Sequence, residues 1–285
     1  MNVNGKGEAD SVTKNFNDIP KFLYGTAWKE DDTRRYVEDA LGAGFRGIDT
    51  ANQRKHYHEI EVGEGIKNCI SRGLCTRKDL FLQTKFTSIH GQDSRLPYDL
   101  KAPLSLQVQQ SFESSLSHLN TDYLDSYILH GPTRSRGLGS EDWEIWGAIE
   151  DLHQAGKTRF IGVSNVNIEQ LRLLCGKARI KPAFVQNRCF ARTGWDREVR
   201  RFCRENQIIY QGFSLLTANP EIFAKPAFAD IVRRFGATPA QIVFRFAIHV
   251  GMMILTGTTQ PAHMKEDLAS LDFELSAKDI AAIEG

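Results

Sequence analysis

The sequence predicts a single-domain α/β protein, a (β/α)8 TIM barrel, from three observations. Eight short runs rich in β-branched and aromatic residues alternate along the chain with segments of helical periodicity. Alternating strands and helices favour a parallel sheet, because parallel neighbours need a crossover connection. The chain has 285 residues, 41% of them hydrophobic, and a single barrel of this kind commonly takes about 250.

A doubly wound open sheet is the alternative fold for the same alternation. Its dinucleotide-binding form expects a GxGxxG turn after the first strand. The end of the first predicted strand has the sequence GTAWK at 25–29, which contains no such turn. The closed barrel is therefore favoured over the open sheet.

The predicted elements follow one another regularly. The strands cover residues 22–28, 47–51, 80–86, 123–130, 158–165, 183–189, 208–215 and 252–258. The helices cover 31–44, 60–73, 104–119, 141–156, 168–178, 196–207 and 238–251, with a short one at 227–235. Asp31-Asp32 and Thr238-Pro239 are suitable helix starts, and the glycines at 44, 73 and 156 are suitable stops.

Two long connections interrupt this order, residues 87–103 after the third strand and 216–225 after the seventh. Both follow the carboxyl end of a strand, where barrel enzymes carry their active sites. We therefore expect both connections to form walls of a substrate pocket.

Composition excludes several classes of protein. The net charge is +1 with no long block of like charge, so a nucleic-acid partner is not expected. No apolar run approaches the roughly 20 residues that span a bilayer, and the polar start at 1–14 does not resemble a signal peptide. We expect a cytoplasmic protein with a polar N-terminal extension at 1–18 and a barrel domain at 19–285. Its oligomeric state is left open.

The five cysteines are odd in number and scattered, with no CxxC spacing. This pattern argues against a disulfide framework and against a zinc site, so no metal is expected. The thiols are expected to be reduced and mostly buried.

Four polar side chains stand at or just after the ends of predicted strands. Asp49 follows RGI, Lys85 follows LFLQT, His130 follows YIL, and Tyr57 comes shortly after Asp49. In a parallel barrel these side chains would meet on one rim. An acid, a cation, an imidazole and a phenol in one place can together donate a proton.

The chemistry of the four depends on the phenol. A phenol ionises near pH ~10, so Tyr57 needs a neighbour that favours its anion. The Lys85 ammonium is expected to lower the pKa of Tyr57, while Asp49 keeps Lys85 charged. His130 is expected to hydrogen-bond a substrate carbonyl. Taken singly, each residue also has a structural explanation as a turn, surface or core residue.

Several segments carry a resemblance to a known family over nearly the whole chain. They are YGTAW at 24–28, GFRG at 44–47, IDTA at 48–51, YILHGP at 127–132, GVSN at 162–165 and FELS at 273–276. With these segments the chain resembles the aldo-keto reductases. The resemblance implies a (β/α)8 fold, reduction of a small-molecule carbonyl by a nicotinamide cofactor, and a catalytic set of Asp49, Tyr57, Lys85 and His130.

The same resemblance implies a set of cofactor contacts. Ser164, Asn165 and Gln186 match carboxamide contacts, and Phe213 stands where the family stacks an aromatic ring on the nicotinamide. The other implied cofactor-binding residues are Gly25, Thr26, Ser214, Leu216, Thr256, Gly257, Thr258, His263, Glu266 and Asp267. Trp28 is expected to belong to the apolar wall that contacts the substrate.

Three features depart from the family pattern. The family places its phenol about five residues after the aspartate, and that position is Arg54 here. Glu59 and Gly63 match the family pattern again in the following helix. Tyr57 therefore remains the choice of proton donor over His56 or His58. The two cations that grip the 2′-phosphate of NADP are replaced by Gly257 and His263, so NADP(H) is favoured over NAD(H) only by family habit. The chain also stops soon after the FELS segment, which predicts an open, permissive pocket.

The predicted function is reduction of an aldehyde or ketone by hydride transfer, with Tyr57 as the general acid. The alternative is a catalytically silent cofactor-binding protein with a regulatory or redox-sensing role on the same barrel. A Schiff-base aldolase using Lys85 is disfavoured, because a lysine paired with Asp49 stays protonated and is a poor nucleophile.

Overall fold

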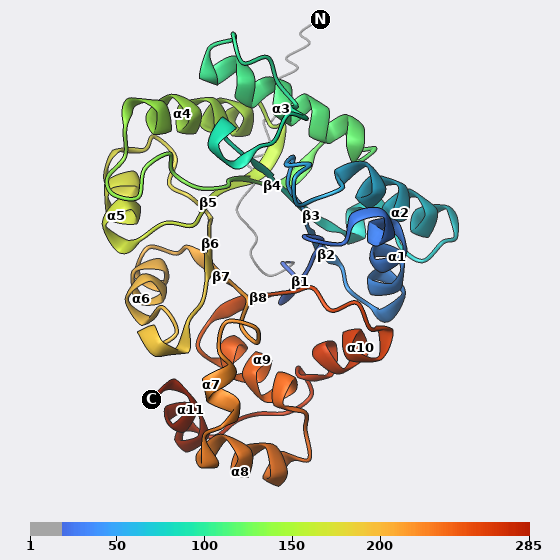
Figure 1. Ribbon diagram of the computed structural model, residues 1–285, viewed down its shortest axis with the longest axis vertical. Coiled ribbons are helices and arrows are strands. Elements are labelled where there is room, and N and C mark those ends of the chain that lie inside the picture. Colours follow the sequence, from blue (N-terminus) through green and yellow to red (C-terminus); the bar gives the residue numbers. More distant parts are fainter. Residues whose placement is uncertain (1–18) are drawn as a thin grey trace, which may run out of the picture.

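A computed structural model describes residues 19–285 and forms a closed barrel of eight parallel strands, β1 to β8 in chain order (Figure 1). β1 pairs with both β2 and β8, which closes the ring. The single-domain (β/α)8 prediction is confirmed. The strands are β1 (Phe22–Gly25), β2 (Gly47–Asp49), β3 (Phe81–Phe86), β4 (Leu124–Leu129), β5 (Thr158–Ser164), β6 (Phe184–Arg188), β7 (Ile209–Phe213) and β8 (Met252–Thr256).

Eight of the helices around the barrel match predicted segments. They are α1 (Thr33–Ala43), α2 (Glu59–Ser71), α3 (Leu104–His118), α4 (Ser140–Gln154), α5 (Ile168–Lys177), α6 (Arg197–Glu205), α8 (Pro226–Phe235) and α9 (Pro239–His249). α9 begins as predicted, with the Thr238 side chain accepting a hydrogen bond from the backbone N–H of Gln241. α1 begins later than predicted, because Glu30–Asp32 form a 3-10 turn and the Asp32 side chain makes no cap.

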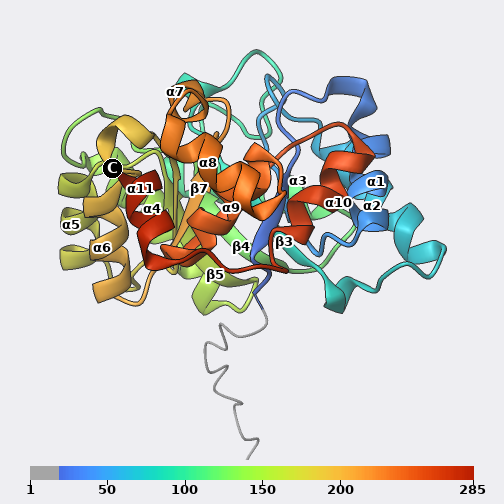
Figure 2. The same ribbon diagram turned by 90° about the horizontal axis from the view of Figure 1, so that it is seen from below.

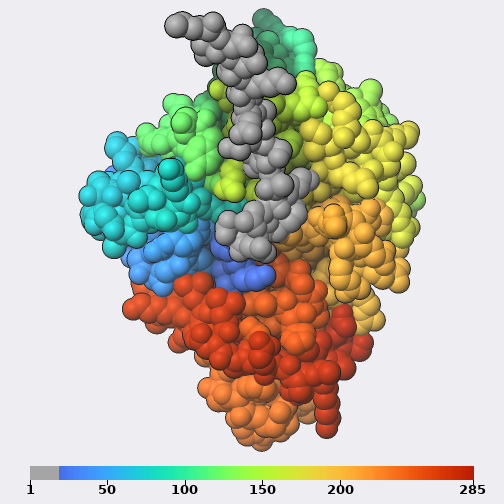
Figure 3. Space-filling view, turned by 180° about the vertical axis from the view of Figure 1, so that it is seen from behind, coloured from blue at the N-terminus to red at the C-terminus, as the bar shows by residue number. Residues whose placement is uncertain are grey.

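Three helices were not predicted: α7 (Pro220–Phe223), α10 (Pro261–Ala269) and α11 (Ala277–Glu284). α7 lies within the connection 216–225, on the side of the barrel where the strands end, and it stands at the top of Figure 2. Figure 3 shows the opposite end of the barrel, where the described chain begins, in blue. No helix within residues 19–285 is both long and apolar enough to cross a membrane.

Two apolar regions hold the barrel together. The larger lies between strands and helices and contains Trp146 and Trp195, both buried. The smaller fills the inside of the barrel, where Phe184 packs edge-on against Phe81 and Phe160 at ring-centroid distances of 5.6 Å. The five cysteines are free and buried, as predicted.

Alternation along β3 places a polar layer above this inner apolar cluster. Phe81 belongs to the inner cluster, and the next inward-facing residues along the strand are Gln83 and Lys85. Gln83 hydrogen-bonds across the barrel to Gln211 of β7. The interior therefore changes from apolar to polar towards the carboxyl ends of the strands, where the site lies.

Candidate active site

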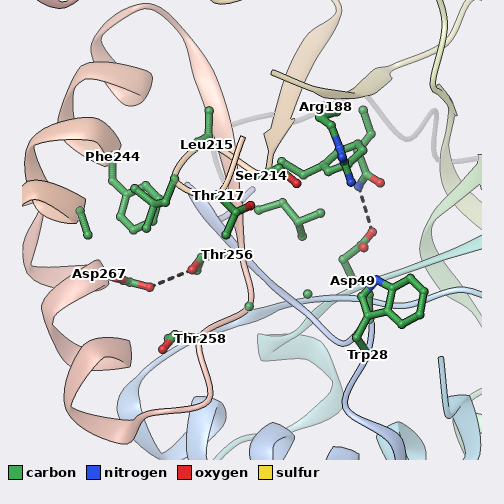
Figure 4. A pocket seen from close by; sticks show the side chains of 18 of the residues that line it. Trp28, Asp49, Arg188, Ser214, Leu215, Thr217, Phe244, Thr256, Thr258 and Asp267 are labelled. Atoms are coloured by element: carbon green, nitrogen blue, oxygen red, sulfur yellow. Dashed lines mark hydrogen bonds between the residues drawn. The ribbon is translucent and has the colours of Figure 1, made fainter. Parts of the chain in front are cut away.

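A pocket of about 980 Å³ opens at the carboxyl ends of the strands (Figure 4). Ligand pockets of proteins typically span about 300–1,000 Å³, so this one lies at the upper end of that range. Three residues at its strand ends, Trp28, Asn165 and Ser214, have left-handed backbone with φ of 61°, 55° and 57°. Such backbone is uncommon outside glycine and is found preferentially at functional sites.

Most of the predicted site residues line this one pocket. They are Gly25, Trp28, Asp49, Tyr57, His130, Ser164, Asn165, Gln186, Phe213, Ser214, Leu216, Thr256, Gly257, Thr258, His263, Glu266 and Asp267. Two predicted residues do not line it. Thr26 is buried and donates its hydroxyl hydrogen bond to the backbone oxygen of Asp49, and Lys85 is buried next to Asp49.

Of the two connections that were expected to form walls of the pocket, one contributes lining residues and the other does not. The connection 216–225 contributes Leu216, Thr217 and Phe223 to the pocket. The connection 87–103 contributes no lining residue, so that prediction is wrong. It packs against the barrel instead, where the Tyr98 ring lies 5.7 Å from the ring of Phe86 at the end of β3.

Lys85 and Asp49 form a buried ion pair. Lys85 Nζ lies 2.6 Å from Asp49 Oδ2 and 2.8 Å from the backbone oxygen of Thr50, and neither charged side chain is more than 1% exposed. Burial lowers the pKa of the Lys85 ammonium, and the negative charge of Asp49 opposes that shift. The attraction between the two side chains offsets part of the hydration that each loses on burial.

Tyr57 lies close to both the lysine and the histidine. Lys85 Nζ is 5.3 Å from the centroid of the Tyr57 ring, and the His130 ring lies edge-on at 6.0 Å. Arg54 does not line the pocket and instead pairs with Glu30 at 3.6 Å. The structure therefore places Tyr57, rather than Arg54, near Lys85 and His130.

The expected lowering of the Tyr57 pKa is not found. Burial, and secondarily the charge of Asp49, raise the pKa of Tyr57 above its ordinary value. The Lys85 ammonium directs hydrogen bonds to Asp49 and Thr50, so much of its charge is offset by the carboxylate. Tyr57 is consequently a protonated phenol throughout the neutral range.

His130 is a neutral imidazole. Burial, together with the charge of Lys85, lowers the pKa of His130 to about 3. Its Nδ1 is 2.7 Å from Thr87 Oγ1, which fixes the ring. A neutral imidazole carries one N–H, so His130 can donate one hydrogen bond without bringing a second positive charge near Lys85.

The predicted carboxamide contacts are already tied into the protein. The Ser164 hydroxyl donates to the backbone oxygen of Gln186 at 2.7 Å, and Asn165 Nδ2 donates to the backbone oxygen of His130 at 2.8 Å. Gln186 Nε2 donates to Asp49 Oδ1 at 3.0 Å, and Figure 4 shows the Asp49 side chain at the pocket. What these side chains still offer to a ligand is mainly oxygen acceptors.

The far end of the pocket, at β8 and α10, is acidic. Thr256 Oγ1 donates to Asp267 Oδ2 at 2.9 Å, a contact drawn in Figure 4, and burial raises the pKa of Asp267 to about 6. Glu266 lines the same end. A buried lysine, Lys29, contacts the pocket residue Gly257: its Nζ lies 2.6 Å from the backbone oxygen of Gly257, and burial lowers the pKa of Lys29 to about 8.

Sequence reasoning missed several pocket residues. Arg188, at the end of β6, has its guanidinium 5.7 Å from the centroid of the Phe213 ring. His56, considered only as an alternative to Tyr57, lines the pocket with its ring tilted by 39° against the Trp28 ring at a centroid distance of 3.9 Å. For Arg188 a signal existed, since it stands two residues after Gln186 and so faces the same side of its strand.

Comparison with known proteins places this geometry in a family. The model of the "Aldo/keto reductase family" matches residues 21–219. The chain is 30% identical over 279 residues to "Uncharacterized oxidoreductase YtbE" of Bacillus subtilis (strain 168), covering 97% of this chain and 92% of that protein. It is 28% identical to "Prostaglandin F synthase 2" of Bos taurus, covering 95% and 90%.

Solved structures give the same result. The Bombyx mori aldo-keto reductase AKR2E4, solved in complex with NADP, superposes with a TM-score of 0.79 at 26% identity, covering 93% of this chain and 88% of that one. An aldo/keto reductase from Brucella melitensis gives a TM-score of 0.78 at 28% identity, covering 93% and 94%. The resemblance in the sequence is thereby confirmed. The chain belongs to the aldo/keto reductase family, whose members are NAD(P)H-dependent oxidoreductases that act on small-molecule carbonyl compounds.

Proposed function

We propose that this protein reduces an aldehyde or ketone to the alcohol, with Tyr57 as the proton donor to the carbonyl oxygen. One observation carries the proposal: the Tyr57 ring lies at the pocket close to both Lys85 Nζ, 5.3 Å from its centroid, and the His130 ring at 6.0 Å. A positioned acid of this kind contributes typically 10²–10⁴-fold to a reaction rate.

The raised pKa of Tyr57 keeps the phenol protonated before the reaction, and it also makes the phenol a weaker acid. A phenol that stays protonated holds its proton ready at every pH near neutrality. The alkoxide formed when hydride reaches a carbonyl carbon is a stronger base than a phenolate, so the proton moves from Tyr57 to the substrate oxygen. The nearby Lys85 ammonium then stabilises the phenolate that is left behind.

Asp49 and His130 act on the same step from two sides. Asp49 keeps Lys85 charged in a buried position, where an unpaired ammonium would lose its proton. With the Thr87 hydroxyl donating to Nδ1, the one N–H of the neutral His130 ring is at Nε2, where it donates towards the substrate oxygen and orients the carbonyl. Trp28, with 69% of its surface exposed and stacked on His56, provides an apolar wall for the substrate.

The lining residues fit a nicotinamide dinucleotide, which supplies the hydride when bound. Gln186, Ser164 and Asn165 present oxygen acceptors suited to the carboxamide, and Phe213 presents an aromatic ring suited to stacking. The remaining length of the pocket would hold the rest of the dinucleotide along Gly25, Ser214, Leu216, Thr256, Gly257, Thr258, His263, Glu266 and Asp267. Thr26 supports this surface from below by its hydrogen bond to Asp49.

NADP(H) is the favoured cofactor and NAD(H) the alternative. A relative solved with NADP favours the phosphorylated form. The acidic residues Glu266 and Asp267 favour the other, because a carboxylate accepts hydrogen bonds from a ribose hydroxyl but repels a phosphate. His263 is a basic side chain that lines the same end of the pocket.

The test is a turnover assay of the purified protein with NADPH or NADH and a panel of aldehydes, ketones and sugars. We expect loss of the reduced cofactor's absorbance that depends on the carbonyl compound, with the larger kcat/KM for NADPH. Tight cofactor binding without turnover of any compound would contradict the proposal and favour a regulatory, cofactor-binding protein. A larger kcat/KM with NADH would overturn only the cofactor preference.

A further inference from the structure

A buried ring of polar side chains crosses the barrel directly beneath the pocket. It consists of Asp49 of β2, Gln83 of β3, Gln186 of β6 and Gln211 of β7, each 2% exposed or less. Gln186 and Asp49 line the pocket, whereas Gln83 and Gln211 do not. The ring therefore joins two proposed site residues through two glutamines that no proposed step uses.

The direction of every hydrogen bond in the ring follows from Asp49. A carboxylate accepts hydrogen bonds and donates none, so the amide groups that face Asp49 Oδ1 must present nitrogen. Gln83 Nε2 does so at 2.7 Å and Gln186 Nε2 at 3.0 Å. The other carboxylate oxygen, Oδ2, is taken by Lys85.

Gln211, on the other side of the two amides from Asp49, favours the same amide orientations through its own hydrogen bonds. Its Oε1 accepts from both Gln83 Nε2 and Gln186 Nε2, each at 2.9 Å, and its Nε2 returns a hydrogen bond to Gln83 Oε1 at 3.0 Å. If the Gln186 amide turned over, its oxygen would face both the Asp49 carboxylate and the Gln211 oxygen. Two facing acceptors in a buried site are strongly unfavourable.

One atom of the ring is left for a ligand. Gln186 Oε1 accepts no hydrogen bond from any residue in the described range 19–285, and Gln186 lines the pocket. The ring thus presents a fixed oxygen acceptor to the pocket. A ligand that carries an N–H donor at that place matches it, and one that carries only acceptors does not.

We propose that Gln83 and Gln211 are positioning residues that hold the Gln186 amide with its oxygen towards the pocket, where it accepts a hydrogen bond from the carboxamide of a nicotinamide cofactor. This inference rests on the proposed function. It assigns a task to two side chains that lie a layer below the ligand and touch it only through Gln186.

The test compares the dissociation constants of NADP⁺ and of its 3-acetylpyridine analogue, measured by quenching of tryptophan fluorescence. The analogue carries a methyl ketone in place of the carboxamide and so has no N–H to donate. We expect the wild-type protein to bind NADP⁺ about 2- to 10-fold more tightly than the analogue, the range for one hydrogen bond. If NAD⁺ is the tighter cofactor, the same comparison is made with the NAD⁺ pair.

The decisive variant is Gln211→Met, which keeps the approximate side-chain volume. It removes the Oε1 acceptor and the Nε2 donor that Gln211 contributes to the ring. We expect the ratio of the two dissociation constants to fall towards one without reaching it, because Asp49 Oδ1 still accepts from Gln186 Nε2. Gln83→Met, which frees Gln211 to turn, should move the ratio in the same direction and serves if Gln211→Met does not fold. The matched control is Gln107→Met, which replaces a buried glutamine of α3 that donates to the backbone oxygen of Ala102 at 2.9 Å.

The control should keep the wild-type ratio even if it loses stability. If the folded Gln211→Met or Gln83→Met variant shows the same ratio of dissociation constants as the wild-type protein, the positioning role alone is overturned. The same conclusion follows if the wild-type protein binds the analogue as tightly as NADP⁺. A wild-type protein that binds neither dinucleotide would instead overturn the proposed function, and this inference with it. Circular dichroism identifies the variants that are folded.

Discussion

At the scale of single residues, the positions of the polar groups could be predicted from the sequence, but the pKa values that decide their protonation could not. Asp49, Tyr57 and His130 could be predicted because polar residues at the ends of parallel strands converge on one rim. The pKa of Tyr57 was predicted in the wrong direction. Its shift depends on how completely the side chain is desolvated and on how far Lys85 is neutralised by Asp49, and neither quantity can be obtained from sequence spacing.

The buried pair of Lys85 and Asp49 gives a prediction for stability. Lys85→Met leaves the Asp49 carboxylate buried without its cation, so we expect the free energy of unfolding to fall by about 3–5 kcal/mol. Adding Asp49→Asn removes the unpaired charge and should restore much of that loss, without restoring turnover. Urea denaturation of the two variants measures the difference. A double variant no more stable than Lys85→Met would show that the unpaired charge is not the cause.

At the scale of elements, prediction succeeded where apolar residues repeat over many positions. Most strands and the longer helices have such repeats, whereas α10 and α11 have only 9 and 8 residues, although α6 with 9 residues was also predicted. For α11 a local signal was present, because Ser276 and Asp279 form a capping box. The connection 87–103 was misjudged because its position after a strand does not determine whether it folds over the pocket or beside it.

The contact between β8 and α10 gives a prediction for pH dependence. The pKa of Asp267 is raised from 3.8 to about 6, so between these pH values the folded protein holds a proton that the unfolded chain has released. Stability linked to this group is therefore present at low pH and lost as pH rises through 6. Asp267→Asn keeps the acceptor for Thr256 and avoids the loss.

We therefore expect the variant to gain up to roughly 3 kcal/mol relative to wild type between pH 4 and pH 7. The measurement is the free energy of unfolding of both proteins by urea at several pH values. A difference between them that stays constant with pH would contradict the raised pKa.

At the scale of the whole molecule, closure of the barrel could be predicted from eight alternating units, the chain length and the absence of a GxGxxG turn, but the contacts across the barrel could not. Gln83 and Gln211 are 128 residues apart, and nothing in either segment identifies the other as its partner. The alternation of side chains along a strand predicts which residues face inwards. Only the closed barrel determines which of these meet in the middle.

The packed interior gives a prediction for the barrel as a unit. A Cβ added at Gly162 would lie 2.4 Å from Ile128 Cδ1 and 2.7 Å from the backbone oxygen of Phe184, so β4, β5 and β6 would have to shift. We expect Gly162→Ala to cost about 1–3 kcal/mol in the free energy of unfolding. Gly176→Ala, at a helical site with open space, is the control and should be neutral or stabilising by up to about 1 kcal/mol. Equal effects of the two substitutions would contradict a tightly packed barrel interior.

The most direct test of the proton donor is Tyr57→Phe, which removes one hydroxyl and keeps the ring beside Lys85 and His130. The variant is compared with wild type in single-turnover reduction of one reactive aldehyde, and the dissociation constant of the reduced cofactor is measured in parallel. We expect the reduction rate to fall by about 10²–10⁴-fold while the dissociation constant changes less than about twofold. A reduction rate within a few-fold of wild type would contradict the assignment of Tyr57 as the acid.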